Sequence, residues 1–144
     1  MRVLVQKTNY ASVEICDKIH NHIDFGFVIF VGFTHGDNKE KIDYMVNKVL
    51  NLRIFEDENN VMNKSILDVG GQILSISQFT LYANTKKGNR PSYIEALNGS
   101  EASILYDLFN EKLSKYIDVK TGVFGSDMLI NISNIGPTTI MLEK

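Results

Sequence analysis

The stretch QILSISQFTL, residues 72–81, joins an apolar strand to side chains that an ordinary strand does not need. Ile73, Leu74 and Ile76 favour a strand over 72–80. An amide, an aromatic ring and a hydroxyl follow at its end, in the segment Ser77-Gln78-Phe79-Thr80. A strand end is rigid and leaves its last main-chain groups without ladder partners, so this segment is a candidate functional site.

A second stretch, Asn134-Ile135-Gly136-Pro137-Thr138-Thr139, carries a Gly-Pro pair in another apolar, strand-like context. We predict strands over 127–134 and 138–142, with the pair between them. Proline has no N–H to donate to a sheet, and glycine lets a backbone approach another chain or a ligand. A Gly-Pro between two strands is often only a turn, so the residues alone leave both interpretations open.

The first third of the chain predicts three strands and a helix. Val, Ile and Phe are frequent over 2–7, 11–16 and 25–33, which are therefore predicted as strands. Helical spacing of apolar residues predicts a helix over 38–52. Asp37 and Glu40, three residues apart, resemble a capping box at its start.

The rest of the chain completes an α+β pattern. An acidic, Asn-rich stretch over 56–64 predicts a surface loop, and Pro91 and Ser92 can start a short helix. Ser100 is expected to cap a longer helix. Its apolar face consists of Leu105, Leu108, Phe109, Leu113 and Tyr116. The order βββαβααββ predicts a layered single domain over 1–144, with mixed or antiparallel sheets packed against helices.

Composition places the chain among ordinary globular proteins. Its 144 residues, 44% hydrophobic and 22% charged, suit one domain with a sizeable core. The single cysteine, Cys16, cannot form an internal disulfide and favours a reducing compartment. It lies in an apolar run, which predicts a buried, inert thiol. We expect a cytoplasmic protein without a signal peptide or membrane span, because the sequence opens as a strand and contains no long apolar run.

The net charge of −2 argues against general binding of nucleic acids, and no DNA partner is expected. Any contact with RNA must come from a local patch. The candidate is Lys86, Lys87 and Arg90, in a glycine-containing loop after the first motif. Such a charged run is often only a solvated loop, but its place beside the candidate site favours RNA binding.

Common catalytic signatures are absent from the sequence. His20, His22 and His35 have no Cys or Asp cluster at ligand spacing, so we predict turn residues, no metal site and no cofactor. No phosphate-binding glycine loop or Gly-x-Ser-x-Gly motif occurs. The Thr80 hydroxyl would be a nucleophile only with an adjacent base, and the sequence identifies none.

Together, the two motifs resemble those of the D-aminoacyl-tRNA deacylase family. The resemblance extends over nearly the whole chain, in the family's order and spacing. It includes Met1–Lys7, Leu52–Asp57, Lys87–Ser92 and Thr121–Gly125. Any one tract would be weak evidence, whereas the ordered set is specific.

The resemblance implies hydrolysis of the ester bond of D-aminoacyl-tRNA, which removes D-amino acids from mischarged tRNA. It assigns the catalytic segment to Ser77, Gln78, Phe79 and Thr80. Main-chain N–H groups there, with the Gln78 amide, would stabilise the oxyanion. The ribose 2′-OH of the terminal adenosine would assist. Achiral glycine would also enter the site, so glycyl-tRNA is a second expected substrate.

The family also implies a chiral filter made by a homodimer. Gly136 and Pro137, joined by a cis peptide bond, would reach into the partner's active site and leave no space for an L side chain. Only about 5–6% of X-Pro bonds in folded proteins are cis, so this expectation rests on the resemblance. A pocket for the terminal adenine would use Phe124, Gly125, Ser126 and Met128. Core packing is an equally good interpretation of Phe124 and Met128.

Three positions depart from the family pattern. Thr138 stands where valine is usual, Ile135 where a small polar residue is common, and Lys7 where an arginine helps to hold the Gly-Pro segment. Lysine cannot form the bidentate fork of arginine, so the rigidity of the filter is in question.

Functions of other classes also fit parts of the sequence. A tRNA-binding module without catalysis would use the basic loop, with Phe124 as a stacking platform. A general esterase for D-amino acid derivatives would need its own nucleophile, Thr80 or Ser77. A structural dimer with a degenerate site is disfavoured by the intact motifs.

Overall fold

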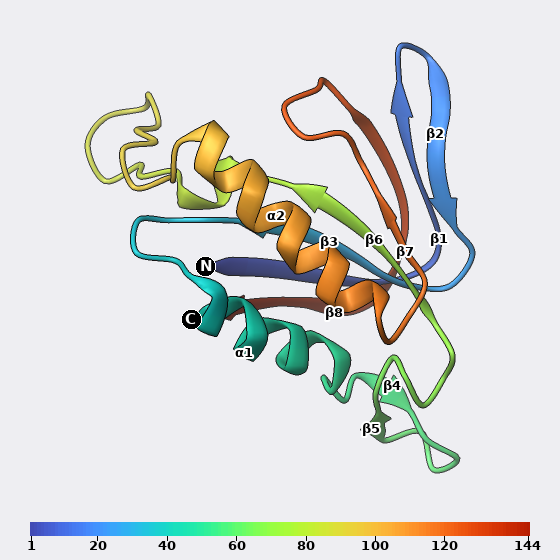
Figure 1. Cartoon of the computed structure of the whole chain (residues 1–144). Coiled ribbons are helices and arrows are strands. Elements are labelled where there is room, and N and C mark those ends of the chain that lie inside the picture. The colour runs from blue at the N-terminus through green and yellow to red at the C-terminus, as the bar shows by residue number, and fades with distance from the viewer.

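The computed structural model describes all residues, 1–144, and contains one mixed sheet, a small hairpin and two long helices (Figure 1). The elements are β1 (Arg2–Ile15), β2 (Lys18–Ile23), β3 (Gly26–Gly32), α1 (Lys39–Leu50), β4 (Phe55–Glu56), β5 (Met62–Lys64), β6 (Gln72–Ser77), the 3-10 helix η1 (Phe79–Tyr82), α2 (Gly99–Ser114), β7 (Val119–Thr121) and β8 (Leu129–Glu143). The predicted α+β class is confirmed.

The main sheet combines parallel and antiparallel pairs. Its strand order is β2-β1-β3-β6-β7, and β8 pairs with β1. The β3–β6 and β6–β7 pairs are parallel, whereas β1 is antiparallel to each of its neighbours. The parallel strands β3 and β6 therefore end at the same edge of the sheet, and the first motif begins there.

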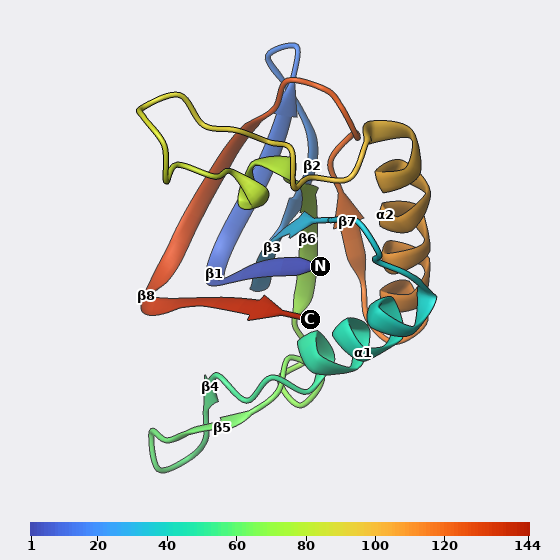
Figure 2. The same cartoon turned by 90° about the vertical axis from the view of Figure 1, so that its left-hand side faces the viewer.

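Side-chain alternation along β3 and β6 divides the interior into two cores. Phe27, Ile29 and Val31 face a large core that they share with α1 and α2, while Val28 and Leu74 belong to a second core. The second core includes residues of β1, β2 and β8 from the opposite face. Successive strand residues point to opposite faces, so one sheet serves both cores. Both helices lie on the same side of the sheet (Figure 2).

Asparagines cap both helices, in place of the residues predicted from sequence. The Asn38 side chain accepts from the Lys41 N–H at the start of α1, and Asn98 accepts from the Glu101 N–H in α2. The predicted capping box at Asp37 is therefore wrong. The Asp37 carboxylate instead accepts from the amino group of Met1, at 2.8 Å, and from the Thr34 N–H.

Strand boundaries differ most from the prediction. β1 and β8 are each continuous, where two strands had been expected in each place. The break that had been predicted within each strand corresponds to an irregular pairing of β1 with β8 near Thr8, where register shifts lie on both sides of this residue. The first-motif strand ends at Ser77, three residues early, since the chain turns into η1. β7 was not predicted.

The turn at Cys16 and Asp17 corrects two further predictions. Both residues have positive φ, 51° and 59°, as in a two-residue hairpin turn. Cys16 is exposed, so the expected buried thiol is wrong. His20 and His22 lie within β2 and not in a turn.

Three other local predictions need correction. The surface loop predicted over 56–64 is confined to 57–61, because its two ends belong to the short strands β4 and β5 of a hairpin. Pro91 and Ser92 start no helix, because the Ser92 main chain pairs with Asn84. Tyr116 lies beyond α2 and is exposed. Neither long helix has the length and apolar character needed to span a membrane.

Candidate functional site

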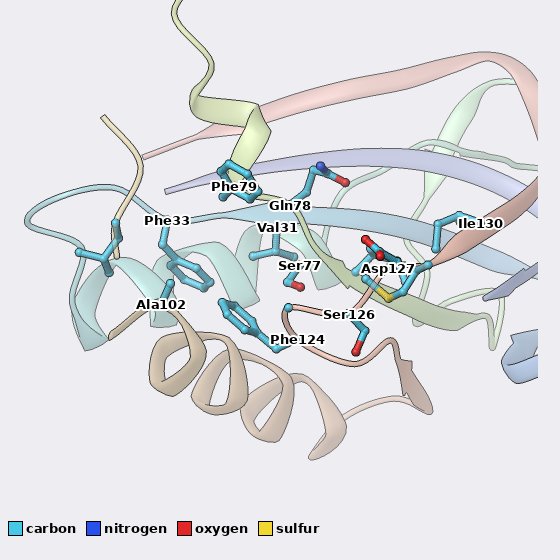
Figure 3. Close-up of a pocket in the computed structure, with 14 residues that line it drawn as sticks. Val31, Phe33, Ser77, Gln78, Phe79, Ala102, Phe124, Ser126, Asp127 and Ile130 are labelled. Atoms are coloured by element: carbon cyan, nitrogen blue, oxygen red, sulfur yellow. The ribbon is translucent and has the colours of Figure 1, made fainter. Parts of the chain in front are cut away.

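A cavity of about 310 Å³ lies at the carboxyl end of β6 (Figure 3). Open sheets commonly bind ligands beyond the carboxyl ends of their parallel strands, and this cavity has that position. Its walls come from β3, β6, the start of η1, the beginning of α2 and the segment before β8. The lining residues are Val31, Phe33, Ile76, Ser77, Gln78, Phe79, Leu97, Ala102, Phe124, Gly125, Ser126, Asp127, Met128 and Ile130.

The cavity brings together two predicted groups that are distant in sequence. Ser77, Gln78 and Phe79 line it from the end of β6, and the segment 124–128 faces them across the opening. All four residues predicted for the adenine pocket are among the lining: Phe124, Gly125, Ser126 and Met128. Phe124 also packs against Tyr106 of α2, with ring centroids 5.9 Å apart, so its ring has a core contact as well.

Hydrogen bonds fix the catalytic segment and restrict the donors that it can offer. The Gln78 N–H donates to the Val31 carbonyl at 2.7 Å, which ties the segment to the end of β3. The Gln78 side-chain amide donates to the Thr80 hydroxyl. The main-chain N–H of Gln78 is therefore occupied, whereas its side-chain amide uses one of two N–H donors and keeps the other. Phe79 and Thr80 open η1, and the first N–H groups of a helix have no acceptor within it.

The Thr80 hydroxyl has no base beside it. Its hydrogen-bond partner is an amide donor, which cannot remove a proton. His20 and His22 lie on β2, and His35 contacts the Ile94 carbonyl outside the cavity. The geometry therefore gives no support for a threonine nucleophile, because nucleophilic hydroxyls require an adjacent base.

Asp127 is the one ionisable residue that lines the cavity, and it was not predicted from the sequence. It lies between Ser126 and Met128, two residues that were predicted to form the adenine pocket. One feature of the sequence could have identified Asp127: it is the only carboxylate among residues 124–128. No group of His, Cys, Asp and Glu residues is arranged to hold a metal ion.

Aromatic rings form an exposed rim on the η1 side. Phe79 is 57% exposed and makes an edge contact with Tyr93, at 5.0 Å between ring centroids. Tyr93 follows the loop that carries Lys86, Lys87 and Arg90. All three basic side chains are exposed, and none makes an ion pair.

Gly136 and Pro137 lie within β8 and are joined by a cis peptide bond, as the resemblance implies. Both residues are exposed, and neither lines the cavity of its own chain. The next residue, Thr138, is 5% exposed, and its hydroxyl has no hydrogen-bond partner. When its amide nitrogen faces the neighbouring carbonyls, Asn134 donates to Lys7 at 3.1 Å and to Thr138 at 3.3 Å.

Lys7 supports this region differently from an arginine fork. Its side chain is buried, and the ammonium lies 5.7 Å from the centre of the Phe55 ring. It pairs with no carboxylate and donates no hydrogen bond to the Gly-Pro segment. The contact that Lys7 makes with this segment is through its main-chain carbonyl and Asn134.

Comparison with known proteins identifies the family of this chain. A model of the family described as D-Tyr-tRNA(Tyr) deacylase matches residues 4–143. The chain belongs to the D-Tyr-tRNA(Tyr) deacylase family. It is 52% identical to a D-aminoacyl-tRNA deacylase from Limosilactobacillus reuteri, with both chains fully covered. It is also 52% identical to one from Listeria monocytogenes, over 100% of this chain and 96% of the relative.

Two solved structures share the fold of this chain. The structure of a c-Myc DNA Unwinding Element Binding Protein is 37% identical, with a TM-score of 0.95 and coverage of 100% and 99%. A probable eukaryotic D-amino acid tRNA deacylase has a TM-score of 0.84 over 98% of this chain and 97% of its own. At 18% identity it shows the fold alone. The deacylase family hydrolyses the ester bond of D-aminoacyl-tRNA, and this reaction is the activity of the chain.

Proposed function

We propose that hydrolysis of D-aminoacyl-tRNA takes place in the cavity at the end of β6, and that main-chain donors and the RNA carry out most of the chemistry. The observation that carries this proposal is that Ser77, Gln78 and Phe79 share one cavity with 124–128, while no base contacts Thr80. The N–H groups of Phe79 and Thr80 would stabilise the oxyanion of the attacked ester. The ribose 2′-OH beside that ester can donate and accept hydrogen bonds.

The Thr80 hydroxyl would serve as a donor in this mechanism. Thr80 does not itself line the cavity but directly follows Phe79, which does. Its oxygen accepts from the Gln78 amide, so its own proton would be available to a substrate that extends past Phe79. The protein would then supply orientation and electrostatic stabilisation, while water is the nucleophile. Proximity and fixed dipoles can account for a large rate increase without a side-chain base.

The terminal adenosine would bind on the 124–128 side. Phe124 offers a ring for stacking, and Ser126 offers a hydroxyl. The exposed Lys86, Lys87 and Arg90 would contact the phosphates of the acceptor end. The small net charge of −2 confines such attraction to this loop, and a cytoplasmic location suits a tRNA substrate.

A homodimer would complete the site. Gly136 and Pro137 are exposed and do not line their own chain's cavity, and a Cβ placed on Gly136 would meet nothing within 4 Å. A segment that is exposed and has no close neighbours in its own protomer is suited to contact another molecule. In the proposed dimer it enters the partner's cavity as a wall that rejects L side chains. Glycyl-tRNA, which has no side chain to reject, would be a second substrate.

Matched D-tyrosyl-tRNA and L-tyrosyl-tRNA test the proposal. We expect rapid loss of the D ester and persistence of the L ester. The release of labelled amino acid measures both reactions. Loss of both esters would retain the hydrolase but remove the chiral filter. Retention of both esters, with tRNA bound, would favour a tRNA-binding module without catalysis.

Duplex DNA provides a second comparison, because the structural neighbour at 37% identity is named for binding a DNA unwinding element. The acidic net charge predicts weak, nonspecific binding of this chain to duplex DNA. Unlabelled duplex should therefore compete poorly with tRNA at equal nucleotide concentration. Competition by the duplex as strong as by tRNA would favour a nucleic-acid-binding function of broader range.

A further inference from the structure

Arg2, the first residue of β1, contacts the turn that follows the catalytic segment. Its Nη1 donates to the Leu81 carbonyl at 2.9 Å, and its guanidinium lies 4.5 Å from the centre of the Tyr82 ring. Leu81 and Tyr82 form the second half of η1, whose first half is Phe79 and Thr80. Arg2 therefore holds the end of the turn that presents the proposed donors, although 77 positions separate it from Phe79 in the sequence numbering.

The turn has few internal supports of its own. η1 contains four residues, and its closing hydrogen bonds are from Leu81 N–H to the Gln78 carbonyl, at 3.3 Å, and from Ala83 N–H to the Thr80 carbonyl, at 3.0 Å. A helix this short is not stable without external contacts. The surroundings must therefore fix it.

Close packing against Gly32 supports η1 on the other side, so that Gly32 and Arg2 together form a clamp around η1. Gly32 pairs with Arg2 across the β1–β3 ladder, and a Cβ on Gly32 would come within 2.9 Å of the Gln78 carbonyl oxygen and 3.2 Å of Leu81 Cβ. Tyr82 is buried beneath the guanidinium, and this burial raises the pKa of its hydroxyl. The ends of β1 and β3 thus hold η1 from two directions.

We propose that Arg2 is a positioning residue for ester hydrolysis, acting through Leu81 and Tyr82 to fix the N–H groups of Phe79 and Thr80. A guanidinium suits this role because it donates in one plane and stacks on an aromatic ring at the same time. The inference rests on the proposed role of these N–H groups. Arg2 does not line the cavity and is not itself a catalytic residue.

The second contact of Arg2 provides a way to separate positioning from simple stability. Its Nη2 lies 3.1 Å from Glu143 Oε1, in an ion pair whose side chains are 29% and 59% exposed. Exposed pairs contribute little to stability, typically about 0–1 kcal/mol. Glu143→Gln therefore removes the ion pair and leaves both contacts to η1 in place.

The experiment compares Arg2→Met, Arg2→Lys and Glu143→Gln in steady-state hydrolysis of D-tyrosyl-tRNA. Methionine keeps an apolar stem but cannot donate to the Leu81 carbonyl. We expect kcat of Arg2→Met to fall about tenfold or more, the range for loss of a charge-assisted hydrogen bond, with KM changed by less than about twofold. Arg2→Lys should recover part of kcat, and Glu143→Gln should match the wild type.

A destabilised control excludes a general loss of folding. Val46 of α1 is buried in the core beneath the helices, so Val46→Ala should lower the melting temperature without touching η1. Wild-type kcat in this variant, with reduced kcat in Arg2→Met, would support the proposal. Equal losses in both variants, or unchanged kcat in Arg2→Met, would overturn it.

Amide hydrogen exchange tests the same inference without any activity. The N–H groups of Leu81 and Ala83 close η1, and they should exchange faster in Arg2→Met while protection in β3 and β6 stays unchanged. Unchanged protection of Leu81 and Ala83 would overturn the clamp, whatever the activity. Failure of the wild type to hydrolyse D-tyrosyl-tRNA would refute the proposed function, while the exchange result would still decide whether Arg2 fixes η1.

Discussion

The side-chain amide of Gln78 donates a hydrogen bond to the hydroxyl of Thr80, two residues further along the chain. A hydroxyl that accepts in this way keeps its own proton available for donation. It would need the opposite arrangement, with a base as partner, to become a nucleophile. This relationship favours a hydrogen-bond donor role for Thr80 over the nucleophilic role, which the sequence already disfavoured because it identifies no adjacent base.

Thr80→Val should therefore reduce activity without abolishing it. Loss of one neutral hydrogen bond is expected to lower kcat about tenfold, and Thr80→Ser should stay close to the wild type. Steady-state hydrolysis of D-tyrosyl-tRNA measures both variants. Complete loss in Thr80→Val, together with an acyl-enzyme trapped by acid quench, would establish a covalent mechanism instead.

Asp127→Asn tests whether the single carboxylate at the cavity acts as a general base. A mechanism based on main-chain donors predicts a change in kcat of less than about threefold, whereas removal of a general base typically costs about 10²–10⁴-fold. Single-turnover hydrolysis at saturating enzyme isolates the chemical step. A loss in that larger range, with unchanged tRNA affinity, would assign the proton transfer to Asp127.

Gly122→Ala should obstruct the cavity through Met128. An added Cβ would lie 2.5 Å from Met128 Sδ and 3.2 Å from Ile76 Cδ1, and Met128 is the flexible partner. Displacement of Met128 should raise KM for D-aminoacyl-tRNA several-fold.

The double variant Gly122→Ala with Met128→Ala provides the control. Shortening Met128 removes the clash, so KM should return toward that of Met128→Ala alone. Additive effects of the two substitutions would mean that they act independently.

Gly136→Ala should leave the fold of one protomer intact and impair catalysis in the dimer. The added methyl group meets nothing within 4 Å in its own chain, so the melting temperature of the isolated protomer should change little. In the partner's cavity the same methyl group should slow hydrolysis of D-tyrosyl-tRNA.

Mixed dimers test the contribution in trans. A Gly136→Ala subunit combined with a subunit impaired at Thr80 regenerates one intact site per dimer only if each cavity uses the partner's Gly136. Activity of the mixture should then exceed that of either variant alone. Activity equal to the mean of the two parents would rule out a shared site.

Acid should destabilise the protein through carboxylates that accept hydrogen bonds. Main-chain N–H groups of Val61 and Asn59 lower the pKa of Asp57 below its ordinary value of 3.8. Because the folded pKa is the lower one, the stabilisation is complete above 3.8 and is lost as the pH falls toward the folded value. In the Asp57→Asn variant, the melting temperature should therefore decrease less steeply at acid pH than in the wild type.

Asp107→Asn provides the matched control, because it removes an exposed carboxylate of α2 whose side chain forms no ion pair. Its melting temperature should decrease at acid pH as steeply as that of the wild type. Identical curves for Asp57→Asn and the wild type would show that this loop contributes nothing to acid sensitivity.

Local signals along the chain were sufficient for some of the fold. The helical spacing of Ile42, Met45 and Val49 predicted α1 closely, since all three are buried on one face. The caps were less predictable, because Asn38 and Asp37 are both good capping residues and long-range contacts decided between them. Asp37 is engaged by Met1, 36 residues away in the sequence.

Some features of the candidate site could likewise be predicted from the sequence, and others could not. Its residue types were visible in sequence, because an amide, a ring and a hydroxyl are unusual together after a buried strand. The availability of their hydrogen-bonding groups was not, since the Gln78 N–H is occupied by Val31 of another strand. Asp127 was missed because one carboxylate in a loop gives no signal until the fold places it at a cavity.

The sequence by itself determined the secondary-structure class, the two motifs and the family, because these depend on residue type and spacing along the chain. Only the tertiary structure decided that residues 77–79 and 124–128 line one cavity, that β8 runs through Gly136 and Pro137, and that Arg2 supports η1. These relationships arise from long-range packing and strand pairing, in which residues far apart in sequence compete for the same partners.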